Sequence, residues 1–410
     1  MCGASKGGSQ MLKRIEQIHS LLRFRLFERR ITRHTRARHD QVLKWVFEKA
    51  AQSEADDFSC FPDSSNNPLV TQGQALVRSV KESFAGKYTG YGDRLRILIH
   101  VPSAKRSPAG YSLFLNLAAS LQFIGVPTRC LAWEESLRDQ LLEFRPTVLL
   151  SSDSAEYLAR LDLDAVRQYR VSQVLKLGLT ASLEEYGNTP LPPRLKWAVG
   201  HGIDFYYSFK APEYLTSRKE YRPFYENGYS ILSVEFGANP LLYHPIAGVT
   251  RDIDFVFLAS RNADKRERYY AYLPGVFRHG QGLWAGITPW VPPAAQRFLY
   301  ARAKVGINLH IDNSLDWPSE LNERTYILAA CGVPQLIDDA KLLPFRFSPD
   351  AMFVAKTPAE YTEMFSAMLK NPALTEQRAL KAQQEVFAKY TTFHRAESLA
   401  TALWHILDHD

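Results

Sequence analysis

The chain has 410 residues, of which 46% are hydrophobic and 23% are charged. This length accommodates two ordinary domains, and the composition excludes a disordered or fibrous protein. The chain contains no apolar run near the ~20 residues that span a bilayer, and Met1 to Gln10 lack the apolar core of a signal peptide. We therefore expect a cytoplasmic protein, with a peripheral place at the inner face of the membrane left open.

The formal net charge of +7 belongs to one segment near the N-terminus. Residues 12–49 contain 11 Lys and Arg against 4 Asp and Glu, and the rest of the chain is balanced. Ile15, Ile18, Leu22 and Leu26 recur at helical spacing, which predicts a basic amphipathic helix. Two interpretations stay open: the helix packs on the body or on another subunit, or it contacts an anionic membrane surface or acidic partner. No nucleic-acid motif accompanies the charge, so no nucleic-acid partner is expected.

From Leu95 onward, buried strands alternate with helices, whereas residues 54–93 are rich in turn formers and are expected to be a linker. Strands are expected at 94–103, 126–133, 146–153, 173–181, 204–210, 228–236, 252–260, 280–286, 305–311, 333–338 and 351–356. Helices are expected at 111–124, 134–144, 155–169, 265–273, 294–303, 320–331, 358–370, 373–389 and 394–407.

This alternation predicts an α/β fold with two Rossmann-like, doubly wound parallel-sheet domains. We expect a helical N-terminal extension and linker at 1–93, a first domain at 94–245 and a second domain at 246–410. Ligands of such sheets lie beyond the carboxyl ends of the strands.

Residues 319–338, SELNERTYILAACGVPQLID, are the most informative stretch. A polar loop runs into a short helix, and a buried strand follows directly from Val333. Ser319 is suited to cap the helix, and Gly332 is suited to the left-handed turn that ends it. Because a helix N-terminus carries unpaired N–H groups and partial positive charge, this unit is suited to bind an anion.

The string at 321–338 resembles the signature of group 1 glycosyltransferases of the CgeB (spore-maturation) type. In that family an Asn-x-Arg-Thr-aromatic-Glu run precedes Cys-Gly and a buried strand. Segments 237–245, 252–273, 298–312 and 388–403 extend the resemblance. It implies the GT-B architecture and transfer of a sugar from a nucleotide diphosphate-sugar donor to a hydroxyl of a glycan, protein or lipid-linked acceptor. Retention of configuration and independence of metal are also implied.

The chain departs from this family pattern at Ile327, where a Glu usually accepts hydrogen bonds from the nucleotide ribose. Ile327 favours an alternative interpretation, in which the protein is a catalytically inactive relative that binds a nucleotide or sugar as a scaffold in a glycosylation complex. A transferase that uses another phosphorylated donor is a third, weaker option.

The resemblance places the donor-binding residues in two segments. Arg261, Lys265 and Arg266 follow the strand at 252–260 and resemble the diphosphate clamp of related enzymes. Arg268 is expected to be a surface residue.

The second donor-binding segment opens the key helix. Asn322 and Arg324 match the family run, and Glu320 or Glu323 is the nearest replacement for the missing Glu in contact with ribose or sugar. An ion pair of Arg324 with Glu320 or Asp316 is the structural alternative.

On the acceptor side, Asp153 and His201 are the catalytic candidates, with a helix cap and a structural His as their ordinary interpretations. No metal site is expected, because His310, Asp312 and Asp316 lack a further ligand at metal spacing, and the four Cys lie far apart. No permanently bound cofactor is expected.

Overall fold

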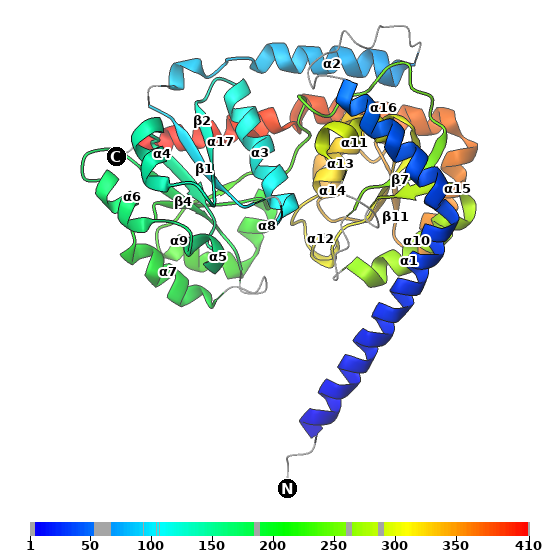
Figure 1. Cartoon of the computed structure of the whole chain (residues 1–410), viewed down its shortest axis with the longest axis horizontal. Coiled ribbons are helices and arrows are strands. Elements are labelled where there is room, and N and C mark those ends of the chain that lie inside the picture. Colours follow the sequence, from blue (N-terminus) through cyan, green and yellow to red (C-terminus); the bar gives the residue numbers. More distant parts are fainter. Residues whose placement is uncertain are drawn as a thin grey trace. The chain divides into compact units, whose positions relative to one another are not determined.

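The computed structural model describes residues 5–52, 67–92, 94–103, 105, 107–183, 189–259, 265–285 and 291–408. The chain forms two compact units, whose elements are labelled in Figure 1. Unit 1 comprises Met1–Ala75, Leu241–Asp316 and Ile327–Glu385, and unit 2 comprises Leu76–Pro240, Trp317–Tyr326 and Val386–Asp410. Neither unit is one continuous stretch, because the segment before Ile327 and the C-terminal helix belong with the first half of the chain.

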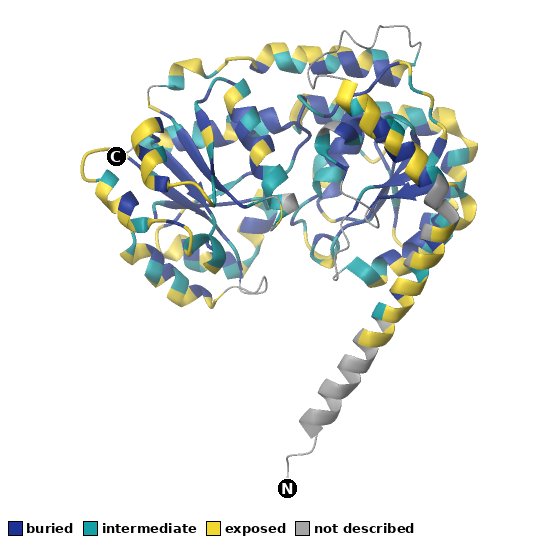
Figure 2. Cartoon of the chain, viewed as in Figure 1, coloured by how far each residue is buried: buried dark blue, intermediate teal, exposed yellow. Residues whose placement is uncertain are grey.

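Unit 2 contains a six-stranded parallel sheet in the order β2-β1-β3-β4-β5-β6. Its strands are β1 (Ile97–Val101), β2 (Thr128–Ala132), β3 (Val148–Ser151), β4 (Lys176–Thr180), β5 (Phe205–Ser208) and β6 (Ile231–Ser233). The central strands β1 and β3 are buried along their whole length, as expected for a parallel sheet covered by helices on both faces. Figure 2 shows this concentration of buried residues in the strands.

The helices of unit 2 connect these strands. They are α3 (Pro108–Phe123), α4 (Leu137–Phe144), α5 (Ala155–Leu158), α6 (Leu163–Tyr169), α7 (Leu191–Gly200), α8 (Pro212–Ser217), α9 (Arg222–Glu226) and the C-terminal α17 (Thr392–Asp408). Short 3-10 turns lie at Thr89–Tyr91 and Lys219–Tyr221. Ser136 caps α4 by accepting a hydrogen bond from a backbone N–H group. Asp162 caps α6 in the same way, so a new helix begins after it and the helix expected at 155–169 is divided into α5 and α6.

Unit 1 contains a five-stranded parallel sheet in the order β11-β10-β9-β7-β8. Its strands are β7 (Ile253–Phe257), β8 (Gly282–Trp284), β9 (Ala303–Asn308), β10 (Gln335–Asp338) and β11 (Phe353–Ala355). Its helices include α1 (Ser5–Gln52), α10 (Arg266–His279), α11 (Pro293–Ala301), α12 (Asp312–Asp316), α14 (Leu343–Arg346) and α15 (Pro358–Lys370). Helices α2 (Pro68–Phe84), α13 (Glu323–Ala330) and α16 (Pro372–Lys389) contain residues of both units. The predicted fold class, two doubly wound parallel sheets, is confirmed.

The N-terminal helix α1 packs into unit 1. Phe24 and Ile31 are buried in the hydrophobic cluster of that sheet, and the ring centroids of Phe24 and Trp284 lie 5.9 Å apart. Farther along the helix, Trp45 meets Phe298 of α11 with ring centroids 6.4 Å apart. The inner face of α1 is therefore part of the unit 1 core, and deleting it would expose that core to water.

The expectation of a linker throughout 54–93 is wrong, because α2 occupies Pro68–Phe84. Residues 53–66 lie outside the described part of the chain. The buried side chains Leu69, Val70, Val77 and Phe84 give α2 an apolar stripe, in which 70, 77 and 84 are seven residues apart and share one helical face. The polar residues between them hide this stripe in the sequence.

Gly237 allows two backbone segments of unit 2 to cross closely. Ala238 donates to Tyr390 O at 3.1 Å and accepts from Thr392 N at 2.8 Å. A Cβ at Gly237 would lie 2.8 Å from Tyr390 O and 3.0 Å from Thr392 N. Since these are backbone atoms, they cannot move aside as a flexible side chain can.

We therefore expect Gly237→Ala to lower the free energy of unfolding by about 1–3 kcal/mol. Gly200→Ala is the matched control, because a Cβ there has no heavy atom within 4 Å. Urea denaturation followed by circular dichroism measures both variants. Equal stability of the two would show that the crossing tolerates a methyl group.

Candidate functional site

The strand order of unit 1 defines where its ligand edge lies. Strand β7 is flanked by β8 on one side and by β9 on the other, so the chain reverses its direction of winding between β7 and β9. In open α/β sheets, ligands bind beyond the carboxyl ends of the strands at such a switch point. The segments that follow β7 and β9 are therefore expected to form the ligand site of unit 1.

A buried ionic cluster lies at this carboxyl edge. The His310 ring Nδ1 lies 2.6 Å from Asp338 Oδ1, and the His310 backbone N–H donates to Asp338 Oδ2 at 2.7 Å. Arg268 Nη1 lies 3.4 Å from Asp338 Oδ2, and its Nη2 donates to Asp312 at 2.8 Å. The cluster joins the ends of β9 and β10 to helix α10.

Asp338 is 1% exposed, and its charge is nevertheless favoured. Burial raises the pKa of its carboxyl, but the charge and hydrogen bonds of His310, with a smaller contribution from Arg268, hold it below its ordinary value. Asp338 is therefore an ionised carboxylate, and in this form it holds both the His310 loop and the Arg268 side chain in place. The expectation that Arg268 is a simple surface residue is wrong, since its side chain is 17% exposed and bound by two carboxylates.

The predicted basic clamp lies at the start of α10. Lys265 precedes the first residue of that helix and Arg266 is its first residue, and both are half-buried. The N-terminus of this 14-residue helix, with the partial positive charge of its dipole, lies at the same carboxyl edge. Arg261 lies outside the described residues. Two cations and a helix N-terminus thus lie on the segment that connects β7 to β8.

The start of α13 is organised differently from the sequence expectation. Asn322 is the cap, since its Oδ1 accepts from Thr325 N at 3.2 Å. Ser319 lies outside the helix, and its carbonyl accepts from Ala211 N at 2.7 Å. The cap assigned to Ser319 is therefore wrong. Gly332 ends the helix with a φ of 66°, so the expected left-handed turn is confirmed.

Glu320 is bound by Lys210, which follows the carboxyl end of β5. The Lys210 Nζ donates to Glu320 Oε2 at 2.6 Å, and the two side chains are only 15% and 13% exposed. Glu320 thus has an ion-pair partner in Lys210 that the sequence did not indicate. Arg324 is half-buried.

Glu323 lies in a low-dielectric environment within unit 2. Asn116 of α3 donates to Glu323 Oε1 at 3.0 Å, and Asn239 donates to Asn116 Oδ1 at 3.1 Å. The Glu323 side chain borders a narrow cavity of about 20 Å³, together with Phe236 and Arg395. Although part of the residue remains accessible, burial raises the pKa of Glu323 to about 7, and the bond from Asn116 only partly opposes this. A carboxyl with such a pKa can exchange protons near neutral pH.

Glu323 should make the stability of the protein depend on pH. Because the pKa is raised from 4.5 to about 7, the folded state holds the proton more tightly than the unfolded state. The free energy of unfolding should therefore fall between these two pH values as pH rises, by roughly 2–3 kcal/mol in total. Glu323→Gln should remove this fall, since Gln keeps an acceptor for Asn116 but never ionises.

Urea denaturation at about pH 5 and about pH 8 tests this linkage. Glu226→Gln, at an exposed position of unit 2, is the control and should keep the wild-type dependence on pH. If Glu323→Gln retains the whole wild-type fall, the raised pKa is not a property of this residue.

Asp153 lies at the carboxyl end of β3 and is 5% exposed. Its carboxylate accepts from the Thr180 hydroxyl at 3.0 Å and from the Ser182 hydroxyl at 2.7 Å, and it pairs with Arg194. Burial raises the pKa of Asp153, and these partners oppose the rise. With its acceptor sites engaged by three side chains, Asp153 joins the loops after β3 and β4, so its geometry supports a structural role.

His201 follows α7, a helix absent from the expected elements. Its Nδ1 lies 2.8 Å from Trp197 O, and its ring stacks on Trp197 with centroids 4.3 Å apart. Because α7 returns the chain to the start of β5, His201 lies at the amino-terminal edge of the sheet, opposite the ligand edge. We therefore propose no catalytic role for His201.

Within the described residues, no group of three or more His, Cys, Asp or Glu side chains is arranged to hold a metal ion. None of the helices in the described ranges is long and apolar enough to cross a membrane. Metal independence remains a prediction.

Residues 260–401 match the sequence model of the family described as glycosyl transferase-like. The fold is similar to that of a glycosyltransferase from Rickettsia africae, with a TM-score of 0.56 and 9% identity over 78% of this chain and 100% of that chain. The fold is also similar to that of sucrose-phosphate synthase from Thermosynechococcus elongatus, with a TM-score of 0.51 and 12% identity over 77% of this chain and 100% of that chain.

The Anabaena protein HepE in complex with UDP-glucose gives a TM-score of 0.50 and 11% identity over 76% of this chain and 100% of that chain. No curated protein matches the sequence. The solved structures establish the GT-B fold, and the C-terminal part of the chain carries the sequence pattern of a glycosyltransferase enzyme.

Proposed function

We propose that this enzyme transfers a sugar from a nucleoside diphosphate-sugar to a hydroxyl group, with the donor diphosphate at the carboxyl edge of the unit 1 sheet. The observation that carries the proposal is the basic start of α10, which follows β7 at the switch point of that sheet. The fold likeness to HepE, solved with UDP-glucose, supports a uridine nucleotide as the first donor to test.

The chemistry follows from where negative charge develops during transfer. When the bond between sugar and diphosphate breaks, charge builds up on the leaving phosphate oxygens. Lys265, Arg266 and the N–H groups at the start of α10 supply fixed positive potential for that charge. Arg261 matches the same clamp in sequence. The Asp338 cluster keeps α10 and the β9 loop in place through Arg268 and His310.

Glu323 is the carboxyl group that we propose to bind a substrate hydroxyl. Ile327 is 4% exposed and apolar, so it cannot accept the hydrogen bond that the family's Glu accepts from ribose. Glu320 is held by Lys210, whereas Glu323 borders a cavity and has a pKa of about 7. We also propose that the acceptor is a glycan, protein or lipid-linked hydroxyl, that configuration is retained and that the donor's charge is balanced by cationic side chains.

A thermal-shift screen against UDP, GDP and ADP tests this function. A ligand that binds only the folded state raises the melting temperature, by an amount that grows with its concentration above the Kd. We expect at least one nucleoside diphosphate to raise the melting temperature, and its 2′-deoxy form to do so less if the ribose is bound by a carboxylate. No shift with any nucleotide at millimolar concentration, together with no hydrolysis of nucleotide sugars, would contradict the proposal.

A further inference from the structure

The outer face of α1 carries apolar side chains that remain exposed. Ile18, Leu22 and Leu26 are 55%, 52% and 65% exposed. Since they are four residues apart, they lie along one side of the helix. The inner side of the same region carries Phe24 and Ile31, which are buried in unit 1. Figure 2 shows the alternation of exposed and buried residues along this part of α1.

The same outer face is strongly basic. Residues 18–33 contain five Arg and one Glu. All five guanidinium-bearing residues are exposed: Arg23, Arg25, Arg29, Arg30 and Arg33. A helical face that combines exposed Leu and Ile with several Arg is typical of helices that lie in the interface of an anionic membrane.

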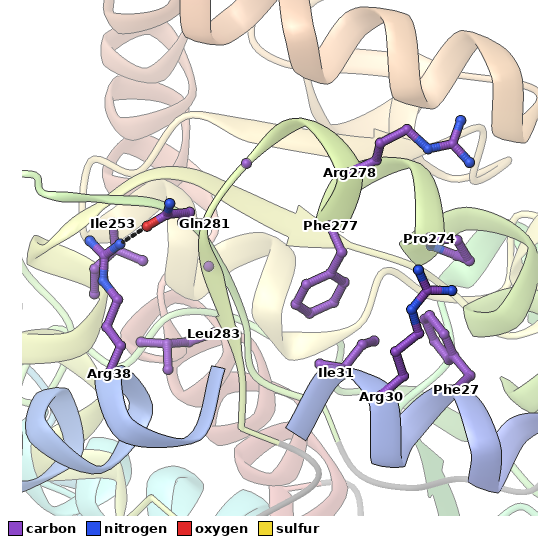
Figure 3. A pocket seen from close by; sticks show the side chains of 12 residues that line it. Phe27, Arg30, Ile31, Arg38, Ile253, Pro274, Phe277, Arg278, Gln281 and Leu283 are labelled. Carbon is purple, nitrogen blue, oxygen red and sulfur yellow. Dashed lines mark hydrogen bonds between the residues drawn. The ribbon is translucent and has the colours of Figure 1, made fainter. Parts of the chain in front are cut away.

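A cavity of about 560 Å³ lies beside this face, between α1 and the C-terminal part of α10. Its apolar lining comes from Phe27 and Ile31 on α1 and from Pro274 and Phe277 on α10. Figure 3 shows that the Phe277 ring points toward Ile31 and that Arg30 extends beside Phe27 toward Pro274. The cavity lies at the amino-terminal edge of the unit 1 sheet, since it is also lined by the first residues of β7 and β8.

Three Arg line this apolar cavity. Arg38 is fixed by bonds to Gln281 Oε1 at 2.5 Å and to Asp252 O at 2.7 Å. Arg30 and Arg278 are exposed, and the described residues that line the cavity include no Asp or Glu. The cavity therefore favours a ligand with an anionic group and an apolar chain. Its volume is within the usual range for a small-molecule site.

We propose that the outer face of α1 docks unit 1 on an anionic phospholipid surface and that the cavity admits part of one lipid. Ile18, Leu22 and Leu26 enter the interfacial region, and the surrounding Arg pair with phosphates. Arg30 and Arg278 hold the phosphate of the admitted lipid, while Phe27 and Phe277 contact its apolar chain. This proposal is independent of the donor site, which lies at the opposite edge of the same sheet.

A phospholipid accounts both for the exposed apolar and basic face of α1 and for the apolar cavity that is lined by Arg. A soluble phosphate would use the Arg but leave the apolar walls and the exposed Leu without a role. An acidic protein surface would likewise not fill an apolar cavity with three Arg in its lining. An amphiphile in a bilayer offers both the negative charge and the apolar surface that these neighbouring regions complement.

Co-sedimentation of the full-length protein with vesicles tests the proposal. We expect binding to phosphatidylcholine vesicles that contain phosphatidylglycerol, and weak or no binding to phosphatidylcholine alone. Raising the salt concentration should weaken the binding. Arg30→Ala with Arg278→Ala should weaken it on the order of 25-fold, from about 1 kcal/mol for each Arg near an anionic surface. Leu22→Ala with Leu26→Ala should weaken it on the order of tenfold.

The matched control is Arg138→Ala with Leu142→Ala, an exposed Arg and an exposed Leu on α4 of unit 2. It should bind vesicles as the wild type does. Unchanged binding by both the double Arg variant and the double Leu variant, or absence of wild-type binding to phosphatidylglycerol vesicles, would overturn the proposal. So would a homodimer in light scattering that Leu22→Ala with Leu26→Ala dissociates, since a second copy would then cover this face.

The nucleotide thermal shift keeps this outcome separate from the donor proposal. Arg30→Ala with Arg278→Ala should keep the nucleotide-induced rise in melting temperature, which also shows that the variant is folded. Conversely, Arg266→Ala should keep vesicle binding. Joint loss of both properties in either variant would contradict the independence of the two sites.

Discussion

Replacing Asp338 by Asn should lower the free energy of unfolding by about 3–5 kcal/mol, the usual cost of removing one partner from a buried ion pair. Asp338 is 1% exposed and is the shared acceptor for His310 and Arg268. Asn has no charge to balance the half-buried Arg268. Its amide also offers one oxygen in place of two, so the backbone and ring of His310 can no longer both be satisfied as they are now.

The adjacent Asp339 provides a matched control for this variant. Its side chain is 36% exposed and pairs at 3.3 Å with Lys341, which is itself 49% exposed. Because exposed pairs contribute at most about 1 kcal/mol, Asp339→Asn should remain near wild-type stability. Urea denaturation of both variants gives the comparison. If Asp338→Asn is as stable as Asp339→Asn, the buried cluster does not hold the carboxyl edge together.

Replacing Lys265 and Arg266 together by Ala should strongly weaken binding of the nucleoside diphosphate that the wild type prefers. Each lost charge-assisted hydrogen bond costs roughly 1.5–3 kcal/mol, which corresponds to about 10- to 150-fold in Kd for each residue. The loss should be larger for a diphosphate than for the nucleoside alone, because the nucleoside lacks the charge that these residues contact. Isothermal titration calorimetry measures both ligands.

Arg278→Ala is the control for this experiment because Arg278 lies on the same helix α10 but near its other end. Removing it subtracts a positive charge from the unit without touching the carboxyl edge, so diphosphate affinity should change little. Equal losses in Arg278→Ala and in the double variant would mean that overall charge, rather than the start of α10, determines binding.

The strands could be predicted from sequence because parallel strands buried on both faces are nearly continuous apolar runs. ILIHV at β1 and VLLS at β3 are such runs, and both are buried throughout. The left-handed turn at Gly332 could also be predicted, because a residue that ends a helix in the left-handed conformation just before a buried strand is usually Gly. The two-sheet fold followed from the alternation of these elements.

Elements whose apolar residues are widely spaced could not be predicted in the same way. Helix α2 buries Val70, Val77 and Phe84 among polar residues, and α7 begins with two Pro that resemble a loop. Without α7, the sequence left His201 as a candidate that could face the ligand, whereas α7 brings it to the amino-terminal edge of the sheet. The cap at Asn322 was missed because Ser319 is an equally good capping residue, and only the backbone path decides between them.

The candidate site depends on contacts between residues far apart in the chain. The basic start of α10 could be predicted because its cations come soon after the strand that the sequence predicts at 252–260. The pairing of Arg268 with Asp338 spans 70 positions, and the bond from Asn116 to Glu323 spans 207. Periodicity and local motifs do not report such pairs, so neither the fixed position of Arg268 nor the raised pKa of Glu323 could be derived from the sequence.

Release of nucleoside diphosphate from a panel of nucleotide sugars, measured by mass spectrometry, tests the central claim most directly. The wild type should cleave at least one nucleotide sugar, with UDP-glucose the first to examine. The variant with Lys265→Ala and Arg266→Ala should lose most of this activity, while Arg278→Ala keeps it. Binding of nucleotide without cleavage of any sugar, or equal cleavage by both variants, would contradict a glycosyltransferase whose donor diphosphate lies at the start of α10.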